Sequence, residues 1–129
     1  MKLNGSYPLP KDFSISAVFQ SLPGIPVSAT YNVTNAEALP TLGRNLSTAT
    51  SVALIQPFTQ FEPRLEQVDL RLARTFRFGH VRVHAQADLY NVLNANNVLA
   101  MQATYGASWL NPQQILAARL FKFGGQLDF

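Results

Sequence analysis

The 129-residue chain has no cysteine, no long hydrophobic run and little charge. The absence of cysteine excludes a disulfide scaffold and a metal site built from thiolates. No run of about 18 apolar residues occurs, so a transmembrane helix is not predicted. Charged residues make up only 13% of the chain, roughly half the share found in a typical soluble domain. The hydrophobic share is 47% with a mean hydropathy of +0.04, a mixture that outer-membrane barrels show because apolar and polar residues alternate.

Motifs for catalysis, metal binding and nucleic-acid binding are also missing. The chain has no G-x-S-x-G, no phosphate-binding loop and no H-E-x-x-H, so we predict no enzyme and no cofactor. The net charge of +3 comes from residues spread singly rather than gathered in a basic patch, so nucleic-acid binding is not predicted. On a strand, His80 and His84 would lie about 13 Å apart, too far to share one metal ion.

The strongest pattern that is present is a long alternation of apolar and polar residues between Leu65 and Tyr90. A period of two indicates strands and not helices. The expected strands have ten residues or more, which suits transmembrane strands of about 9–11 residues better than soluble strands of about 5–6. Arg74 is the one visible fault in the apolar row. That row contains Val68, Leu70, Leu72, Phe76, Phe78, Val81, Val83, Ala85, Ala87 and Leu89.

We therefore expect an all-β protein, an antiparallel up-and-down meander of about five long strands that closes a transmembrane β-barrel. Tight turns at Pro10–Asp12 and Gly79-His80 and long irregular segments at 32–64 and 94–112 separate the strands. The expected strands are Lys2–Leu9, Phe13 to about Tyr31, Leu65–Phe78, Val81–Tyr90 and Gln113–Phe129. Short turns on one side and long loops on the other are typical of outer-membrane barrels.

Aromatic residues support the same arrangement, since they fall at two levels that resemble interfacial girdles. The level near the tight turns, expected to be periplasmic, holds Tyr7, Phe13, Phe76, Phe78 and Phe129. The opposite level, with its loops, holds Tyr31, Tyr90, Tyr105 and Trp109.

The last eight residues follow the pattern of the C-terminal insertion signal of outer-membrane barrels. Counting back from the aromatic Phe129, the chain has an apolar Leu127, then Gly124, then a polar Lys122. Leu127 and Phe129 would share one face of a strand, with Gln126 and Asp128 on the other. An ordinary amphipathic edge strand would show the same residues. If these four residues are an insertion signal, the barrel-assembly machinery is a partner.

Three segments carry a family resemblance. The run Gln67–Gly79 resembles the antepenultimate strand of TonB-dependent receptors, Asp88–Asn94 resembles a recurrent segment of their penultimate strand, and Lys122–Phe129 resembles their closing strand. The segments Tyr105–Trp109 and Ile115–Phe121 are similar to the Oar-like branch, common in acidobacteria.

The resemblance implies a 22-stranded barrel in the bacterial outer membrane with an N-terminal plug, importing large ligands with energy from an inner-membrane TonB-type partner. About five strands cannot close a barrel, since the smallest membrane barrels have roughly 8. We therefore expect residues 1–129 to be the C-terminal segment of a larger receptor, bound to lipid and to the remaining barrel and plug. The first residues contain no apolar signal core, so an exported protein would need further sequence.

Two sets of residues are candidates for function. The first set is expected to face the barrel lumen as a network of mixed charges and consists of Asp69, Arg71, Arg82, His84 and Asp88. The second set lies in the long loops, which often carry ligand contacts, and consists of Arg44, Phe58, Phe61, Tyr105 and Trp109. Two alternatives remain open: a different outer-membrane barrel, such as a porin or an autotransporter translocator, or a soluble β-sandwich or lipocalin-like binding module.

Overall fold

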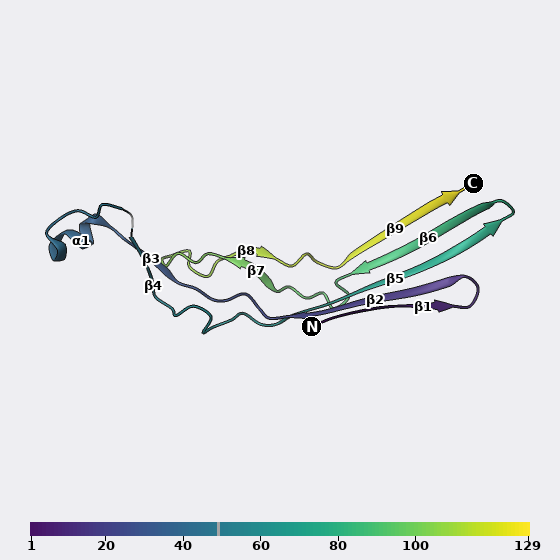
Figure 1. Cartoon of the computed structure of the whole chain (residues 1–129), viewed down its shortest axis with the longest axis horizontal. Helices are drawn as coiled ribbons and strands as arrows, with labels where there is room; N and C mark the ends of the chain where they lie inside the picture. The colour runs from purple at the N-terminus through teal and green to yellow at the C-terminus, as the bar shows by residue number, and fades with distance from the viewer. Residues whose placement is uncertain (49) are drawn as a thin grey trace. The chain divides into compact units, whose positions relative to one another are not determined.

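The computed structural model describes residues 1–48 and 50–129, most of them in strands. One antiparallel sheet has the strand order β1-β2-β5-β6-β9, so each strand lies beside the one that precedes it in this sheet (Figure 1). Its members are β1 (Lys2–Leu9), β2 (Phe13–Leu22), β5 (Leu65–Phe78), β6 (Val81–Tyr90) and β9 (Leu120–Asp128). The predicted all-β, up-and-down antiparallel meander is confirmed.

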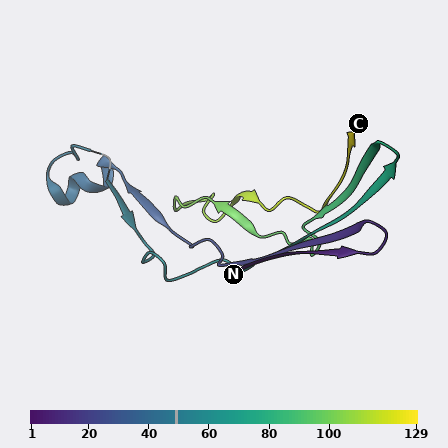
Figure 2. The ribbon, with the colours of Figure 1, turned by 45° about the vertical axis from the view of Figure 1, so that its right-hand side comes forward.

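The chain divides into two compact units. The first consists of residues Met1–Leu22, Arg64–Asn97 and Leu116–Phe129 and holds the five-stranded sheet. The second consists of residues Pro23–Pro63 and Val98–Ile115. It holds the hairpin of β3 (Thr30–Val33) with β4 (Thr50–Ala53), the helix α1 (Asn35–Leu42), and the pair of β7 (Val98–Met101) with β8 (Pro112–Ile115) (Figure 2).

Two predicted strand boundaries were wrong. The second strand ends at Leu22 and not near Tyr31, because Pro23 follows it directly and lacks the N–H group that a ladder requires. At Gly24 the backbone passes very close to the backbone of Glu62. A Cβ at this position would lie 1.9 Å from the Glu62 carbonyl oxygen, so only glycine fits there. The fifth strand begins at Leu120, and β8 is a separate strand in another sheet.

The two segments predicted to be irregular contain short regular elements, including a helix. Thr34 caps α1 in a reciprocal capping box with Glu37, and Gly43 ends it in the left-handed conformation with φ of 64°. Thr34-x-x-Glu37 is the sequence signature of such a start. Pro40 inside the helix and the eight-residue length made this element hard to predict from periodicity. No helix in the described residues is long and apolar enough to cross a membrane.

The strand register divides the five-stranded sheet into an apolar face and a polar face. Directly paired residues share a face. Most apolar residues of the sheet pair with apolar ones; Arg74, opposite Phe13 and Ala85, and Val18, opposite Asp69, are exceptions. On β5 and β6, Leu70 pairs with Leu89 and Phe76 with Val83, while Arg71 pairs with Asp88. Across the whole sheet the apolar face carries Leu3, Tyr7, Leu9, Phe13, Ile15, Phe19, Val68, Leu70, Leu72, Phe76, Phe78, Val81, Val83, Leu89, Phe121, Phe123 and Leu127.

Nothing in the described residues covers this apolar face. The buried hydrophobic residues of residues 1–48 and 50–129 are Ala29 and Ala38, both in the second unit, and no large side chain is fully buried. In contrast, Phe123 is 79% exposed and Leu127 is 59% exposed. The sheet therefore has strands and hydrogen bonds but no hydrophobic core of its own.

Candidate functional site

The polar face of the sheet is held together by a charged pair in its middle. Arg71 donates from Nε to Asp88 Oδ1 at 2.5 Å and from Nη2 to Oδ2 at 3.2 Å. The Asp88 side chain is only 2% exposed, while that of Arg71 is 48% exposed. Tyr90 O–H donates to Asp88 Oδ2 at 3.4 Å. The two-pronged geometry makes this a strong, orienting contact.

Asp69 lies on the same face and ties β5 to the residue that follows β6. It accepts from Gln67 Nε2 at 2.9 and 3.1 Å, and from the backbone N–H of Asn91 at 2.8 Å. Asp69, Arg71, Asp88 and Tyr90, together with Ser16 and Val18, line a shallow hollow on this face. The sequence predicted that Asp69, Arg71 and Asp88 would share a face, and the register places them so.

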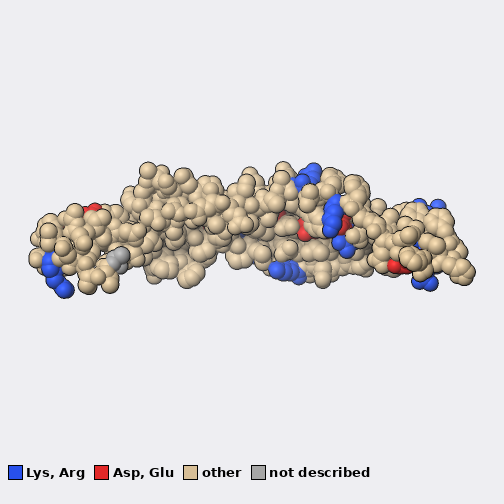
Figure 3. Space-filling view, turned by 90° about the horizontal axis from the view of Figure 1, so that it is seen from above, with Lys and Arg blue, Asp and Glu red and all other residues tan. Residues whose placement is uncertain are grey.

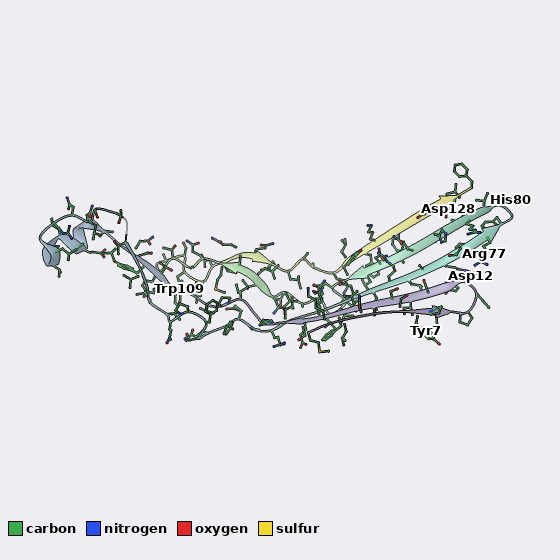
Figure 4. The ribbon with its side chains drawn as sticks, viewed as in Figure 1. Tyr7, Asp12, Arg77, His80, Trp109 and Asp128 are labelled. Atoms are coloured by element: carbon green, nitrogen blue, oxygen red, sulfur yellow. The ribbon has the colours of Figure 1, made fainter. Side chains whose placement is uncertain are left out.

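A second polar cluster lies at the end of the sheet with the tight turns. His84 Nε2 lies 3.2 Å from Asp128 Oδ2, and its Nδ1 lies 2.9 Å from Thr75 Oγ1. Arg77 Nη2 donates to Asp12 Oδ1 at 3.0 Å and so ties the last residues of β5 to the Pro10–Asp12 turn. Figure 4 shows Asp12, Arg77, His80 and Asp128 gathered at this end.

Two cations of the polar face, Arg82 from the expected lumen network and Lys122 from the expected insertion signal, make fewer contacts. Arg82 pairs in register with Arg77 on one side and Asp128 on the other, but it makes no ion pair within residues 1–48 and 50–129. Lys122 pairs in register with Asp88 without a direct contact to it in the part of the chain that is described. The network is therefore two local clusters and not a continuous ladder.

The four residues of the expected insertion signal all lie on or just beyond β9, the sheet's last strand. Leu127 pairs with Val83 on the apolar face, and Phe129 is 99% exposed. Gly124 pairs with Gln86 on the polar face, where an added Cβ would meet Gln86 Nε2 at 3.0 Å. A larger residue at this position would require the Gln86 side chain to shift by a few tenths of an ångström. Whether the pattern acts as a signal stays a prediction.

Asn91 is a structural residue whose role the sequence did not reveal. It is 2% exposed and adopts the left-handed conformation with φ of 50°. Its Nδ2 donates to the carbonyl oxygens of Ala95 and Ala117, each at 2.8 Å, and its Oδ1 accepts from Ala95 N–H at 2.9 Å. Asn94 also has a positive φ, and its Oδ1 accepts from Arg119 N–H at 3.2 Å. This asparagine turn connects the end of β6 to the segment that leads into β9.

The aromatic residues proposed as loop contacts are only partly brought together. The rings of Tyr105 and Trp109 lie 5.5 Å apart at 52°, and Trp109 Nε1 donates to the Ser28 carbonyl at 3.0 Å. Phe58 and Phe61 are 73% and 52% exposed. Within the described residues, Arg44, Phe58 and Phe61 make no ring contact, ion pair or side-chain hydrogen bond with the Tyr105–Trp109 pair.

Glu37 and Tyr31 form the polar contact that fixes the start of α1. Tyr31 O–H donates to Glu37 Oε1, and Thr34 donates to Glu37 Oε2 from its N–H at 2.9 Å and from Oγ1 at 2.7 Å. The hydrogen bond from Tyr31, together with those from Thr34, lowers the pKa of Glu37. The same bond raises the pKa of Tyr31. The contact orders the tip of the β3–β4 segment.

Side chains for metal binding are not assembled in the part of the chain that is described. No group of three or more His, Asp or Glu residues there is positioned to hold an ion.

Comparison of the chain with known proteins finds no matching family model, no similar curated protein and no similar solved structure. The candidate functional feature is therefore the five-stranded sheet itself, with one face uncovered and the other internally bonded.

Proposed function

We propose that this chain is part of the transmembrane β-barrel of an outer-membrane transport protein. The observation that carries the proposal is the uncovered apolar face of the five-stranded sheet. Soluble antiparallel sheets bury one face on a core, whereas a barrel wall in a bilayer presents its apolar residues to lipid and its polar residues to the lumen. The low charge of the surface supports this reading, since Figure 3 shows only scattered charged side chains.

The ends of the sheet favour the same arrangement. The Pro10–Asp12 and Gly79-His80 turns lie at one end, while the connections from β2 to β5 and from β6 to β9 leave from the other. The outer edges of β1 and β9 pair with no further strand among the described residues. Exposed edges are a liability for a soluble protein. In the proposed barrel, neighbouring strands of the same wall pair with them.

Within outer-membrane barrels, we propose a TonB-dependent receptor that imports a large ligand. The support is the resemblance of Gln67–Gly79, Asp88–Asn94 and Lys122–Phe129 to the closing strands of that family. The plug, the energising partner and the ligand belong to this proposal and not to the residues described. A porin or an autotransporter translocator would use the same two-faced wall.

The function is tested with the protein expressed from its natural gene in a bacterial host. We expect it in the outer-membrane fraction, with a folded band that shifts on heating, and we expect deletion of Phe129 to lower its amount. In planar bilayers, a plugged receptor gives no steady conductance, whereas a porin conducts without any treatment. Recovery of the protein in the soluble fraction as a monomer would contradict the membrane proposal. Steady conductance would favour the porin over the receptor.

A further inference from the structure

Arg74 breaks the apolar row of β5 and lies on the face that the proposed barrel turns toward lipid. It pairs in register with Phe13 on β2 and with Ala85 on β6. Its guanidinium carbon lies 4.5 Å from the ring centroids of both Phe13 and Phe76. Stacking on two aromatic faces stabilises the cation and fixes its position.

No carboxylate in the described residues neutralises this cation. The carboxylates there that lie close to a basic side chain are engaged elsewhere: Asp88 with Arg71, Asp12 with Arg77, and Asp128 with the His84 ring. On the apolar face of β5, the nearest acidic residue is Glu66, eight residues away, which corresponds to about 27 Å along a strand. The Nε of Arg74 is shielded from solvent and has no hydrogen-bond partner. The positive charge of Arg74 therefore has no carboxylate partner among the described residues, and an anion from outside the chain can neutralise it.

The surroundings of Arg74 form a shallow hollow that suits a molecule with both apolar and anionic parts. The hollow is lined mainly by apolar side chains: Phe13, Leu72, Phe76, Ala85, Ala87 and Phe123. Phe76 is the next residue of the same face toward the tight-turn end, and Phe13 lies directly opposite Arg74 on β2, so aromatic rings flank the cation on two sides. Acyl chains fit the apolar lining, and a headgroup phosphate fits the cation.

The depth of Arg74 is consistent with a headgroup contact. It lies four residues before Phe78, the last residue of β5, which corresponds to about 14 Å along the strand. With a strand tilt of about 45°, the vertical distance is about 10 Å. A long arginine side chain covers part of such a distance by placing its stem along apolar surface and its charge near the interface.

We propose that Arg74, between Phe13 and Phe76, is a binding site for the phosphate of an anionic phospholipid in the leaflet on the tight-turn side. This inference rests on the proposed membrane function and adds a specific lipid site to it. The uncompensated charge selects an anionic headgroup, because a zwitterionic headgroup brings its own cation.

The test is native mass spectrometry of the protein titrated with phosphatidylglycerol or with a neutral galactolipid that lacks phosphate. Arg74→Leu should weaken the first phosphatidylglycerol binding event about fivefold, as expected for one basic side chain near an anionic membrane surface, without changing galactolipid binding. Arg74→Lys should retain most of the preference. The matched control is Arg82→Leu, which removes an arginine from the polar face and should leave the preference unchanged.

Several outcomes overturn the lipid site. An unchanged preference in Arg74→Leu, or an equal loss in Arg82→Leu, would show that the binding is not made by Arg74. Displacement of the lipid by inorganic phosphate, but not by chloride at equal ionic strength, would point to free phosphate instead. Insertion into vesicles is measured first by protease protection. A protein that stays outside vesicles contradicts both proposals, whereas an inserted protein with an unaffected Arg74→Leu variant contradicts only this one.

Discussion

The two faces of the five-stranded sheet differ in how their side chains are paired and buried. On the polar face, Asp88 is nearly buried by its own neighbours and bonded to Arg71 and Tyr90. On the apolar face, Phe123 and Leu127 are exposed, and no layer of the described residues packs against them. The difference shows that the nearly buried carboxylate of the polar face finds its partners within the sheet, whereas the large apolar side chains of the other face lie exposed. If the sheet belongs to the proposed barrel wall, we expect its stability to depend on lipid.

The largest expected effect comes from placing the same charge on each face. Leu70→Arg should destabilise the protein in vesicles by about 2–4 kcal/mol, the cost of an arginine on the lipid side of a barrel near mid-depth. Val18→Arg is the matched control, since Val18 lies on the polar face and pairs in register with Asp69. We expect its effect to be within about 0.5 kcal/mol. Urea unfolding in vesicles measures both, and equal losses would contradict the assignment of faces.

The asparagine turn gives the next effect. Asn91→Ala should cost about 2–3 kcal/mol, because it removes a buried side chain that bonds three backbone groups and leaves them without partners. Asn91→Gly keeps the left-handed conformation but loses the same bonds, so the difference between the two variants isolates the backbone contribution. Asn94→Gly, which removes only one bond to Arg119, should be milder. A loss in Asn94→Gly as large as in Asn91→Ala would contradict this reading.

The charged pair of the polar face should show strong coupling. Arg71→Leu leaves the nearly buried Asp88 carboxylate without its main partner, and we expect a loss of about 1–3 kcal/mol. The double variant Arg71→Leu with Asp88→Asn should recover part of that loss, because no uncompensated charge remains. A double-mutant cycle by urea unfolding measures the coupling energy. Additive effects would mean that the pair is only a screened surface contact.

The smallest expected effect on stability lies outside the sheet, at Glu37, and depends on pH. Because the pKa of Glu37 is lowered in the folded protein, its contribution to stability is present above the unfolded pKa and is lost as the pH falls through the folded pKa. We expect acidification through this range to loosen helix α1 and its cap before it affects the sheet. Amide hydrogen exchange at residues 34–42 measures this, and Glu37→Gln should remove the pH dependence. Unchanged exchange in the wild-type protein would contradict it.

Much of the sheet could be predicted from the sequence because its period-two pattern is long and regular. The bounds of β1, β5 and β6 and the division of faces follow from that pattern. The end of β2 could not be predicted, because Pro23 marks a bend as readily as a strand end. The approach of Gly24 to Glu62 depends on residues far apart in the sequence.

The polar clusters were predicted only in part, since pairing across strands depends on register. The sequence placed Arg71 and Asp88 on one face, but it could not show that Asp88 is nearly buried or that Arg82 has no ion pair among the described residues. Arg74 was visible as a fault in the apolar row, whereas its stacking on Phe13 required the β2–β5 register. Asn91 was part of a recognised segment, and only its positive φ and its bonds reveal its role.

The central claim is that one face of the sheet contacts lipid and the other contacts water. The chain has no cysteine, so single cysteines placed along residues 81–90 of β6 can each carry one nitroxide label in vesicles. Electron paramagnetic resonance then measures the accessibility of each label to oxygen, which concentrates in lipid, and to a water-soluble nickel complex. We predict strict alternation, with labels at odd positions accessible to oxygen and labels at even positions accessible to nickel. Nickel access at both sets of positions, or protection of the odd positions from both reagents, would contradict the account.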